Sequence, residues 1–144
     1  MGGTFDHLHE GHKSLIKTAL SFSNKIVIGL TTEKLLKNKK AASVLEDYET
    51  RKRNLEDFIK TIADINRVQI IELNDIYGPP INEAGYDGIV VSQETYKVAE
   101  KINEIRESKG FKPLIIIVIP IIKDNFNQKI SSTSIREKIL FKNM

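Results

Sequence analysis

Four short runs of sequence rich in Val and Ile constrain the fold of this 144-residue chain more than any other feature. They occupy residues 25–31, 67–73, 87–92 and 114–120, and their apolar residues are nearly continuous rather than alternating. Such runs are typical of parallel strands covered on both faces. Apolar residues spaced three and four apart predict helices between and after them, at residues 11–22, 48–65, 94–109 and 133–141.

The alternation of strand and helix predicts an α/β fold, built as a doubly wound parallel sheet in a three-layer sandwich. The length and the 40% apolar content fit a single domain over residues 1–144. A net charge of +3 is too small to indicate a nucleic-acid partner. The chain has no cysteine, which excludes a thiolate nucleophile, and no apolar run of the roughly 18 residues that a membrane span needs. We therefore expect a cytoplasmic protein with no membrane partner.

The segment HLHEGH, residues 7–12, contains all three histidines of the chain. His9 and His12 flank Gly11 where a loop enters the first predicted helix, and a helix start offers unpaired N–H groups to an anion. Imidazoles in that place are positioned to donate to phosphate oxygens as negative charge grows on them. The alternative is that these histidines only cap the helix or lie on the surface.

A second motif, ISSTSIR, lies near the other end of the chain. Ser131, Ser132 and Thr133 precede a predicted helix that contains Arg136. Hydroxyl residues are preferred at helix N-caps, and the same exposed N–H groups also bind phosphate. The motif alone fits capping and phosphate binding equally well.

Together, GGTFDHLHEGH and ISSTSIR resemble the nucleotidylyltransferase superfamily, whose members have a Rossmann-like sheet. The intervening KNKK, YETRKRNLEDF and IVVSQETYKVAEKINEIRESKG resemble the phosphopantetheine adenylyltransferase family of the archaeal and eukaryotic type. This resemblance implies transfer of AMP from ATP to 4′-phosphopantetheine, which gives dephospho-coenzyme A and pyrophosphate in coenzyme A biosynthesis. We expect Mg²⁺ as the cofactor, held mainly by the ATP phosphates, and assign no metal-ligating residue.

Two alternatives stay open. One is a cytidylyltransferase or a flavin-nucleotide adenylyltransferase of the same superfamily. The other is a nucleotide-binding module without catalytic activity.

The resemblance also implies roles for individual residues. The expected catalytic residues are His12, His9 and Lys40. The expected ATP-binding residues are Thr4, Phe5, His9, Gly11, His12, Ser131, Ser132, Thr133 and Arg136. The expected contacts to the acceptor are Thr4, Lys37, Lys39, Lys40, Arg51, Ser92, Glu94 and Thr95.

The chain departs from the family at its first strand. That strand normally precedes the GG of GGTF, whereas only Met1 stands there. We therefore expect a first strand that is shortened or missing, or a sequence that starts late. A shortened central strand is expected to leave its neighbours without part of their hydrogen bonding.

Overall fold

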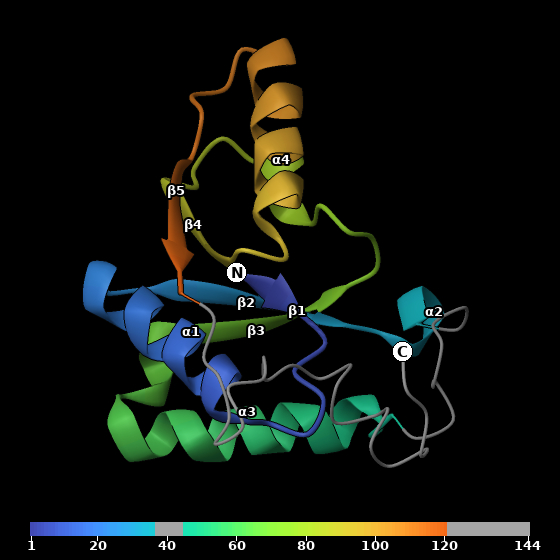
Figure 1. Ribbon diagram of the computed structural model, residues 1–144, viewed down its shortest axis with the longest axis vertical. Helices are drawn as coiled ribbons and strands as arrows, with labels where there is room; N and C mark the ends of the chain where they lie inside the picture. The colour runs from blue at the N-terminus through green and yellow to red at the C-terminus, as the bar shows by residue number, and fades with distance from the viewer. Residues whose placement is uncertain (37–44, 121–144) are drawn as a thin grey trace.

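The computed structural model describes residues 1–36 and 45–120 of the chain (Figure 1). In chain order the elements are β1 (Gly2–Gly3), α1 (Glu10–Phe22), β2 (Ile26–Thr31), α2 (Glu33–Leu36), α3 (Tyr48–Ile62), η2 (Ile65–Arg67), β3 (Val68–Leu73), η3 (Pro79–Ile81), β4 (Gly88–Ser92), α4 (Tyr96–Ser108) and β5 (Ile115–Ile119). Every strand pair is parallel. The predicted α/β class is confirmed, and the four Val- and Ile-rich runs are β2, β3, β4 and β5.

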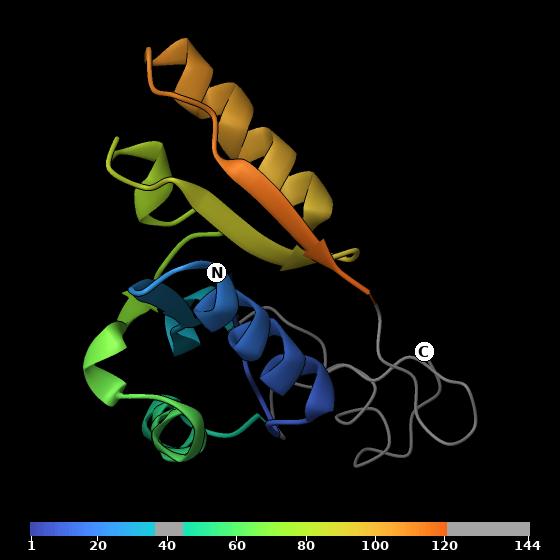
Figure 2. The ribbon, with the colours of Figure 1, turned by 90° about the vertical axis from the view of Figure 1, so that its left-hand side faces the viewer.

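The strands form two sheets within the described residues. One has the order β1–β2–β3, with Gly2 opposite Gly29 and Ile28 opposite Ile70, and the other pairs β4 with β5. Figure 2 shows the β4–β5 pair standing apart from the three-stranded sheet. The prediction of a shortened first strand is confirmed, because β1 has only two residues. Within the described residues β1 pairs with β2 and not with the β4–β5 sheet, so strand pairing does not join the two sheets.

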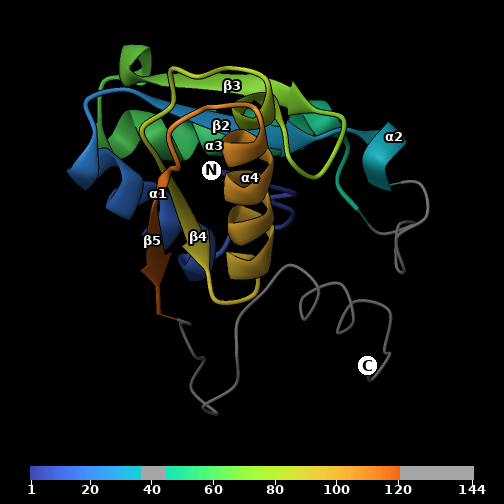
Figure 3. The same cartoon turned by 90° about the horizontal axis from the view of Figure 1, so that it is seen from above.

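Helix α1 joins the two sheets in place of strand pairing. Ile16 is fully buried among Ile28 of β2 and Leu55 and Ile59 of α3. Ala19, one turn further along the same face of the helix, packs in a second apolar cluster with two residues of the β4–β5 sheet, Val90 and Ile119. The helix that begins at the histidine segment therefore packs against both sheets. Helix α4 contacts β4 and β5 as well, and Figure 3 shows it alongside these strands.

The end of α3 differs most from the sequence prediction. The helix expected over residues 48–65 ends at Ile62, because Ala63 is extended and the Asp64 carboxylate caps η2 by accepting from the Asn66 N–H at 2.9 Å. The segment 75–86 between β3 and β4 contains the short η3. The helix expected over residues 133–141 lies outside the described residues. None of the helices in the described part combines the length and apolar composition that crossing a bilayer requires.

Arg106 of α4 fixes the segment before β4. Its guanidinium is fully buried and donates to five main-chain carbonyls, at 2.7–3.3 Å. Four of these carbonyls belong to residues between Pro80 and Tyr86, and the fifth belongs to Lys112. The connection into β4 is thereby tied to α4.

We predict that Arg106→Met lowers the free energy of unfolding by about 3 kcal/mol, because it leaves five partly buried carbonyls without their donor. Urea unfolding measures the loss. The control is Lys109→Met, whose exposed ammonium reaches the Ile81 carbonyl at 2.6 Å and whose loss should cost under about 1 kcal/mol. Equal losses in the two variants would contradict a role for Arg106 as the organiser of this segment.

Candidate active site

His9 and His12 cap α1 in a reciprocal arrangement. The Gly11 N–H donates to His9 Nδ1 at 3.1 Å, and the His9 N–H donates to His12 Nδ1 at 3.2 Å. The two rings stack with centroids 3.7 Å apart, and the Phe5 ring lies 5.2 Å from that of His12. The Gly11 and His9 backbone thus fixes the orientation of both imidazoles.

The capping bonds also fix which ring nitrogen carries the proton. A nitrogen that accepts a hydrogen bond from a backbone N–H is unprotonated, so in the neutral imidazole the proton lies on the other nitrogen. In both His9 and His12 the accepting atom is Nδ1, and Nε2 is therefore the donor. Within the described residues, His9 Nε2 is buried and has no hydrogen-bond partner. A donor of this kind suits an anionic oxygen.

Burial keeps both rings neutral. Burial, with a smaller contribution from the neighbouring His9, lowers the pKa of His12 from 6.5 to about 3. Burial also lowers the pKa of His9 from 6.5 to about 4, although the carboxylates of Glu10 and Glu94 act in the opposite direction. Glu94, in the turn after β4, thus acts electrostatically on His9.

Arg51 ties the ends of the first two strands together. The side chain is completely buried in the first turns of α3. Its Nη1 donates to the carbonyls of Thr4 and Thr31 at 3.0 and 2.8 Å, and its Nε donates to the Glu46 carbonyl at 2.9 Å. Burial lowers the pKa of Arg51, and the carboxylates of Glu33 and Asp6 act in the opposite direction and raise it.

The position of Arg51 limits the acceptor contact expected from the sequence. Among the described residues its Nη2 makes no hydrogen bond and lies 3.9 Å from the Glu33 carboxylate. A contact between Arg51 and an acceptor stays a prediction. If it forms, Nη2 is the guanidinium nitrogen that has no hydrogen bond to the described residues and can donate to the acceptor.

Polar residues also follow the ends of β2, β3 and β4, where ligands bind in parallel sheets. The Thr32 hydroxyl after β2 donates to Asn74 Oδ1 after β3 at 2.9 Å. Beyond β4, the Ser92 N–H donates to Thr95 Oγ1 at 3.2 Å, and the Thr95 N–H donates to the Ser92 carbonyl at 3.1 Å. Glu94, whose carboxylate acts to raise the pKa of His9, lies within this turn.

The structure brings together part of the predicted site. Thr4, Phe5, His9, Gly11 and His12 form one continuous loop and helix start. The Phe5 ring is buried in the core, so contact between Phe5 and a nucleotide would involve its main chain and stays a prediction. Seven of the expected residues lie outside the described residues: Lys37, Lys39, Lys40, Ser131, Ser132, Thr133 and Arg136.

Two polar residues of the site were missed from the sequence. The Asp6 carboxylate is fully buried and accepts from the Glu46 N–H at 2.9 Å, and the Glu46 carboxylate accepts from the His7 N–H at 2.7 Å. Asp6 lies within the GTFD motif, which was a signal for it. Glu46 has no such signal, because it precedes a helix in an otherwise ordinary charged segment.

Comparison with known proteins identifies similar sequences over nearly the whole chain. The family model described as cytidylyltransferase-like matches residues 1–138. Phosphopantetheine adenylyltransferase of Methanopyrus kandleri is 41% identical over 139 residues, which are 96% of this chain and 88% of that protein. The protein of the same name from Pyrococcus abyssi is 42% identical over 140 residues, 97% of this chain and 88% of its own. The one from Saccharomyces cerevisiae is 38% identical over 94% of this chain and 46% of its own length.

Solved structures share the fold. A protein of unknown function from Archaeoglobus fulgidus superposes with a TM-score of 0.72 at 30% identity, over 83% of this chain and 95% of that one. A bifunctional NMN adenylyltransferase/ADP ribose pyrophosphatase from Francisella tularensis has a TM-score of 0.61 at 19% identity, over 100% of this chain and 41% of its own. The expectation of a Rossmann-like α/β fold is confirmed.

The low pKa values of the capping histidines predict how stability depends on pH. Unfolded histidines bind protons below about pH 6.5, whereas His9 and His12 in the folded state do so only near pH 4 and pH 3. The free energy of unfolding should therefore be independent of these groups above pH 6.5. It should fall as the pH is lowered from 6.5 toward 4, by up to about 1.4 kcal/mol per pH unit for each histidine.

His9→Asn tests this assignment, because asparagine is also a good N-cap but does not titrate. The difference in unfolding free energy between wild type and variant should change between pH 7 and pH 4.5 and be constant from pH 7 to pH 8. Chemical denaturation at a series of pH values measures it. A difference that stays constant over the whole range would mean that His9 is not held neutral.

Proposed function

The chain belongs to the cytidylyltransferase-like family, and from this premise we propose that it transfers AMP from ATP to 4′-phosphopantetheine, giving dephospho-coenzyme A and pyrophosphate. The archaeal relatives named phosphopantetheine adenylyltransferase support this reaction, since they are about as long as this chain and align with it almost from end to end. The enzyme is a nucleotidyltransferase of coenzyme A biosynthesis.

The observation that carries the proposal is the pair of Nε2–H donors on one rigid helix start. His9 and His12 are stacked, neutral and oriented by backbone N–H groups, and His9 Nε2 has no partner among the described residues. Donors that are already oriented stabilise charge that develops on phosphate oxygens without reorganisation during the reaction.

The reaction needs no further nucleophile from the protein. An oxygen of the acceptor phosphate attacks the α-phosphorus of ATP, and the bond between that phosphorus and the bridging oxygen of pyrophosphate breaks. The attacking oxygen is already anionic, so no proton has to be removed from it. Negative charge develops on the oxygens around the α-phosphorus, and the two Nε2–H groups are suited to meet it.

We propose that Mg²⁺ reaches the site on the nucleotide. Both imidazoles use Nδ1 as a hydrogen-bond acceptor and carry hydrogen on Nε2, so neither offers a free lone pair to a cation. The described residues at the histidine pair therefore do not fit a metal ligand set. Mg²⁺ is expected to be coordinated mainly by phosphate oxygens, which it prefers.

The donors on His9 and His12 fit any nucleoside triphosphate, so nucleotide choice separates this proposal from its alternatives. We expect pyrophosphate release from ATP with 4′-phosphopantetheine and little release from CTP or with flavin mononucleotide as acceptor. A coupled pyrophosphate assay over these combinations measures it. Preference for CTP would instead indicate a cytidylyltransferase, and ATP binding without turnover of any acceptor would indicate a binding module.

His12→Ala tests the donor role directly. Loss of one preorganised donor should lower kcat by about 100- to 1000-fold and leave ATP affinity nearly intact, because the interaction strengthens only in the transition state. The cap that is lost should cost only about 1 kcal/mol of stability, so the variant should remain folded. Steady-state kinetics measures kcat, equilibrium binding measures ATP affinity, and a thermal melt measures stability.

The matched control is Lys17→Ala, which truncates an exposed side chain on the same helix. It should leave kcat within about threefold of wild type, a change of roughly 0.7 kcal/mol in the barrier. A His12→Ala enzyme that also stays within that range would refute the donor role.

A further inference from the structure

The loop that leads from β1 to His9 contains two non-glycine residues in the left-handed region. The φ angle is 50° at Phe5 and 48° at His7. For residues with a side chain this conformation costs roughly 1–2 kcal/mol each, and it persists only where the surroundings hold it. The direction in which the chain enters α1 depends on these two residues, so the groups that hold them also orient the histidines.

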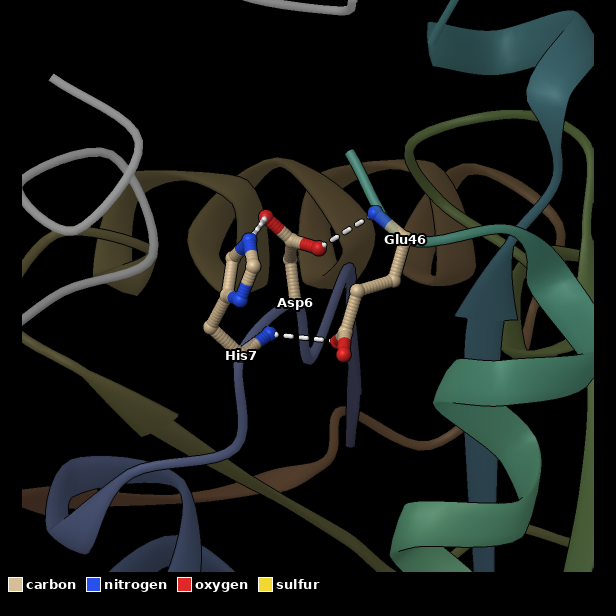
Figure 4. A group of neighbouring side chains, drawn as sticks. All are labelled: Asp6, His7 and Glu46. Carbon is tan, nitrogen blue, oxygen red and sulfur yellow. Dashed lines mark hydrogen bonds and ion pairs between the residues drawn. The ribbon is translucent and has the colours of Figure 1, made fainter. Parts of the chain in front are cut away.

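Glu46 holds His7 through a reciprocal pair of bonds with the loop (Figure 4). The His7 N–H donates to Glu46 Oε1 at 2.7 Å, and the Glu46 N–H donates to Asp6 Oδ1 at 2.9 Å. Asp6 is fully buried, and its other oxygen lies 3.5 Å from His7 Nε2. The two bonds link the histidine loop to Glu46, and their partners are 39 and 40 residues apart in the sequence.

Helix α3 holds Glu46 in turn. The Glu46 carbonyl accepts from Arg51 Nε at 2.9 Å, and its Oε2 accepts from Asn54 Nδ2 at 3.4 Å. Arg51 also donates to the Thr4 carbonyl. The loop is therefore held at Thr4 by Arg51 of α3 and at His7 by Glu46, which precedes α3. The position of the Glu46 carboxylate is therefore fixed by bonds to α3, independently of its bond to the loop.

The same three residues bring potential metal-ligand atoms together. One ligand atom each from Asp6, His7 and Glu46 lies within 4.8 Å of the others. Both carboxylates, however, already accept backbone N–H groups within this cluster. Hydrogen bonding accounts for the cluster, and we assign it to positioning rather than to metal binding.

We propose that Glu46 is a positioning residue of the active site, whose carboxylate keeps His7 in its left-handed conformation and thereby aims His9 and His12 at the phosphates. The proposal rests on the function proposed above. Its physical basis is that a misplacement of catalytic donors by about 1 Å can cost around 100-fold in rate. A short charge-assisted hydrogen bond to the His7 N–H is well suited to prevent such a shift.

Two variants of Glu46 separate hydrogen bonding from charge. Glu46→Ala removes the acceptor, and we expect kcat to fall at least about tenfold with ATP affinity changed less than about threefold. Glu46→Gln keeps an oxygen that can accept from the His7 N–H, so kcat should return to within about threefold of wild type. Rescue by glutamine is the readout that a role of the Glu46 charge would not produce, and the exchange of the His7 N–H reports on the hydrogen bond itself.

Asp57→Ala is the matched control. Asp57 lines the same surface hollow as His7 and Glu46, and it is exposed, so the variant removes a carboxylate nearby without removing the bond to His7. It should leave kcat within about twofold of wild type. Equal kcat values in Glu46→Ala and wild type, or equal losses in Glu46→Ala and Glu46→Gln, would overturn the proposal.

A measurement without substrate keeps this inference distinct from the proposed function. Amide hydrogen exchange followed by NMR should show faster exchange of the His7 N–H in Glu46→Ala than in wild type, and wild-type protection in Glu46→Gln. If the wild-type protein releases no pyrophosphate from any substrate pair, the proposed function fails, while His7 protection still decides whether Glu46 holds the loop. Unchanged protection of His7 in Glu46→Ala would overturn the positioning role even in an active enzyme.

Discussion

The site depends on one buried cation, the guanidinium of Arg51. Parallel strands end with carbonyls that have no further partner in the ladder, and here the carbonyls of Thr4 and Thr31 both accept from Arg51 Nη1. Its Nε holds the Glu46 carbonyl. Taking a guanidinium out of water is expensive, and these carbonyls, with the Asp6 and Glu33 carboxylates nearby, offset that cost. One side chain thus fixes the ends of two strands and the start of α3 relative to each other.

A second constraint is the way in which the two sheets are held together. Within the described residues β1 pairs with β2, and backbone hydrogen bonds do not hold the β4–β5 sheet against the other sheet. Apolar packing of α1 against both sheets supplies this connection instead, through Ile16 and Ala19. The same helix begins at the histidine pair. The element that carries the donors is therefore also the element that sets the distance between Thr4 and the turn after β4.

Much of the fold could be predicted from the sequence because its signals are local. The four apolar runs give the strands to within one residue at nearly every end, and the spacing of apolar residues gives α1, α3 and α4. The predicted end of α3 was wrong because a local competitor, the capping carboxylate of Asp64, starts η2 there. The histidine segment could be predicted as a site from its composition and place. Glu46 and the burial of Arg51 could not, since both depend on bonds to residues some 40 positions away, and an arginine in an amphipathic helix is ordinarily solvated.

The two interpretations of the histidines that the sequence left open, capping and phosphate binding, turn out to be complementary. Each imidazole has two nitrogens, and the cap uses only Nδ1. That use places hydrogen on Nε2, which turns the opposite edge of the ring into a donor. A charged imidazolium would lose the cap, since it has no nitrogen left to accept from the backbone. Burial that keeps the rings neutral therefore stabilises the helix start and prepares the donors at the same time. In this loop, the stability of the fold and the chemistry of the site rest on the same protonation state.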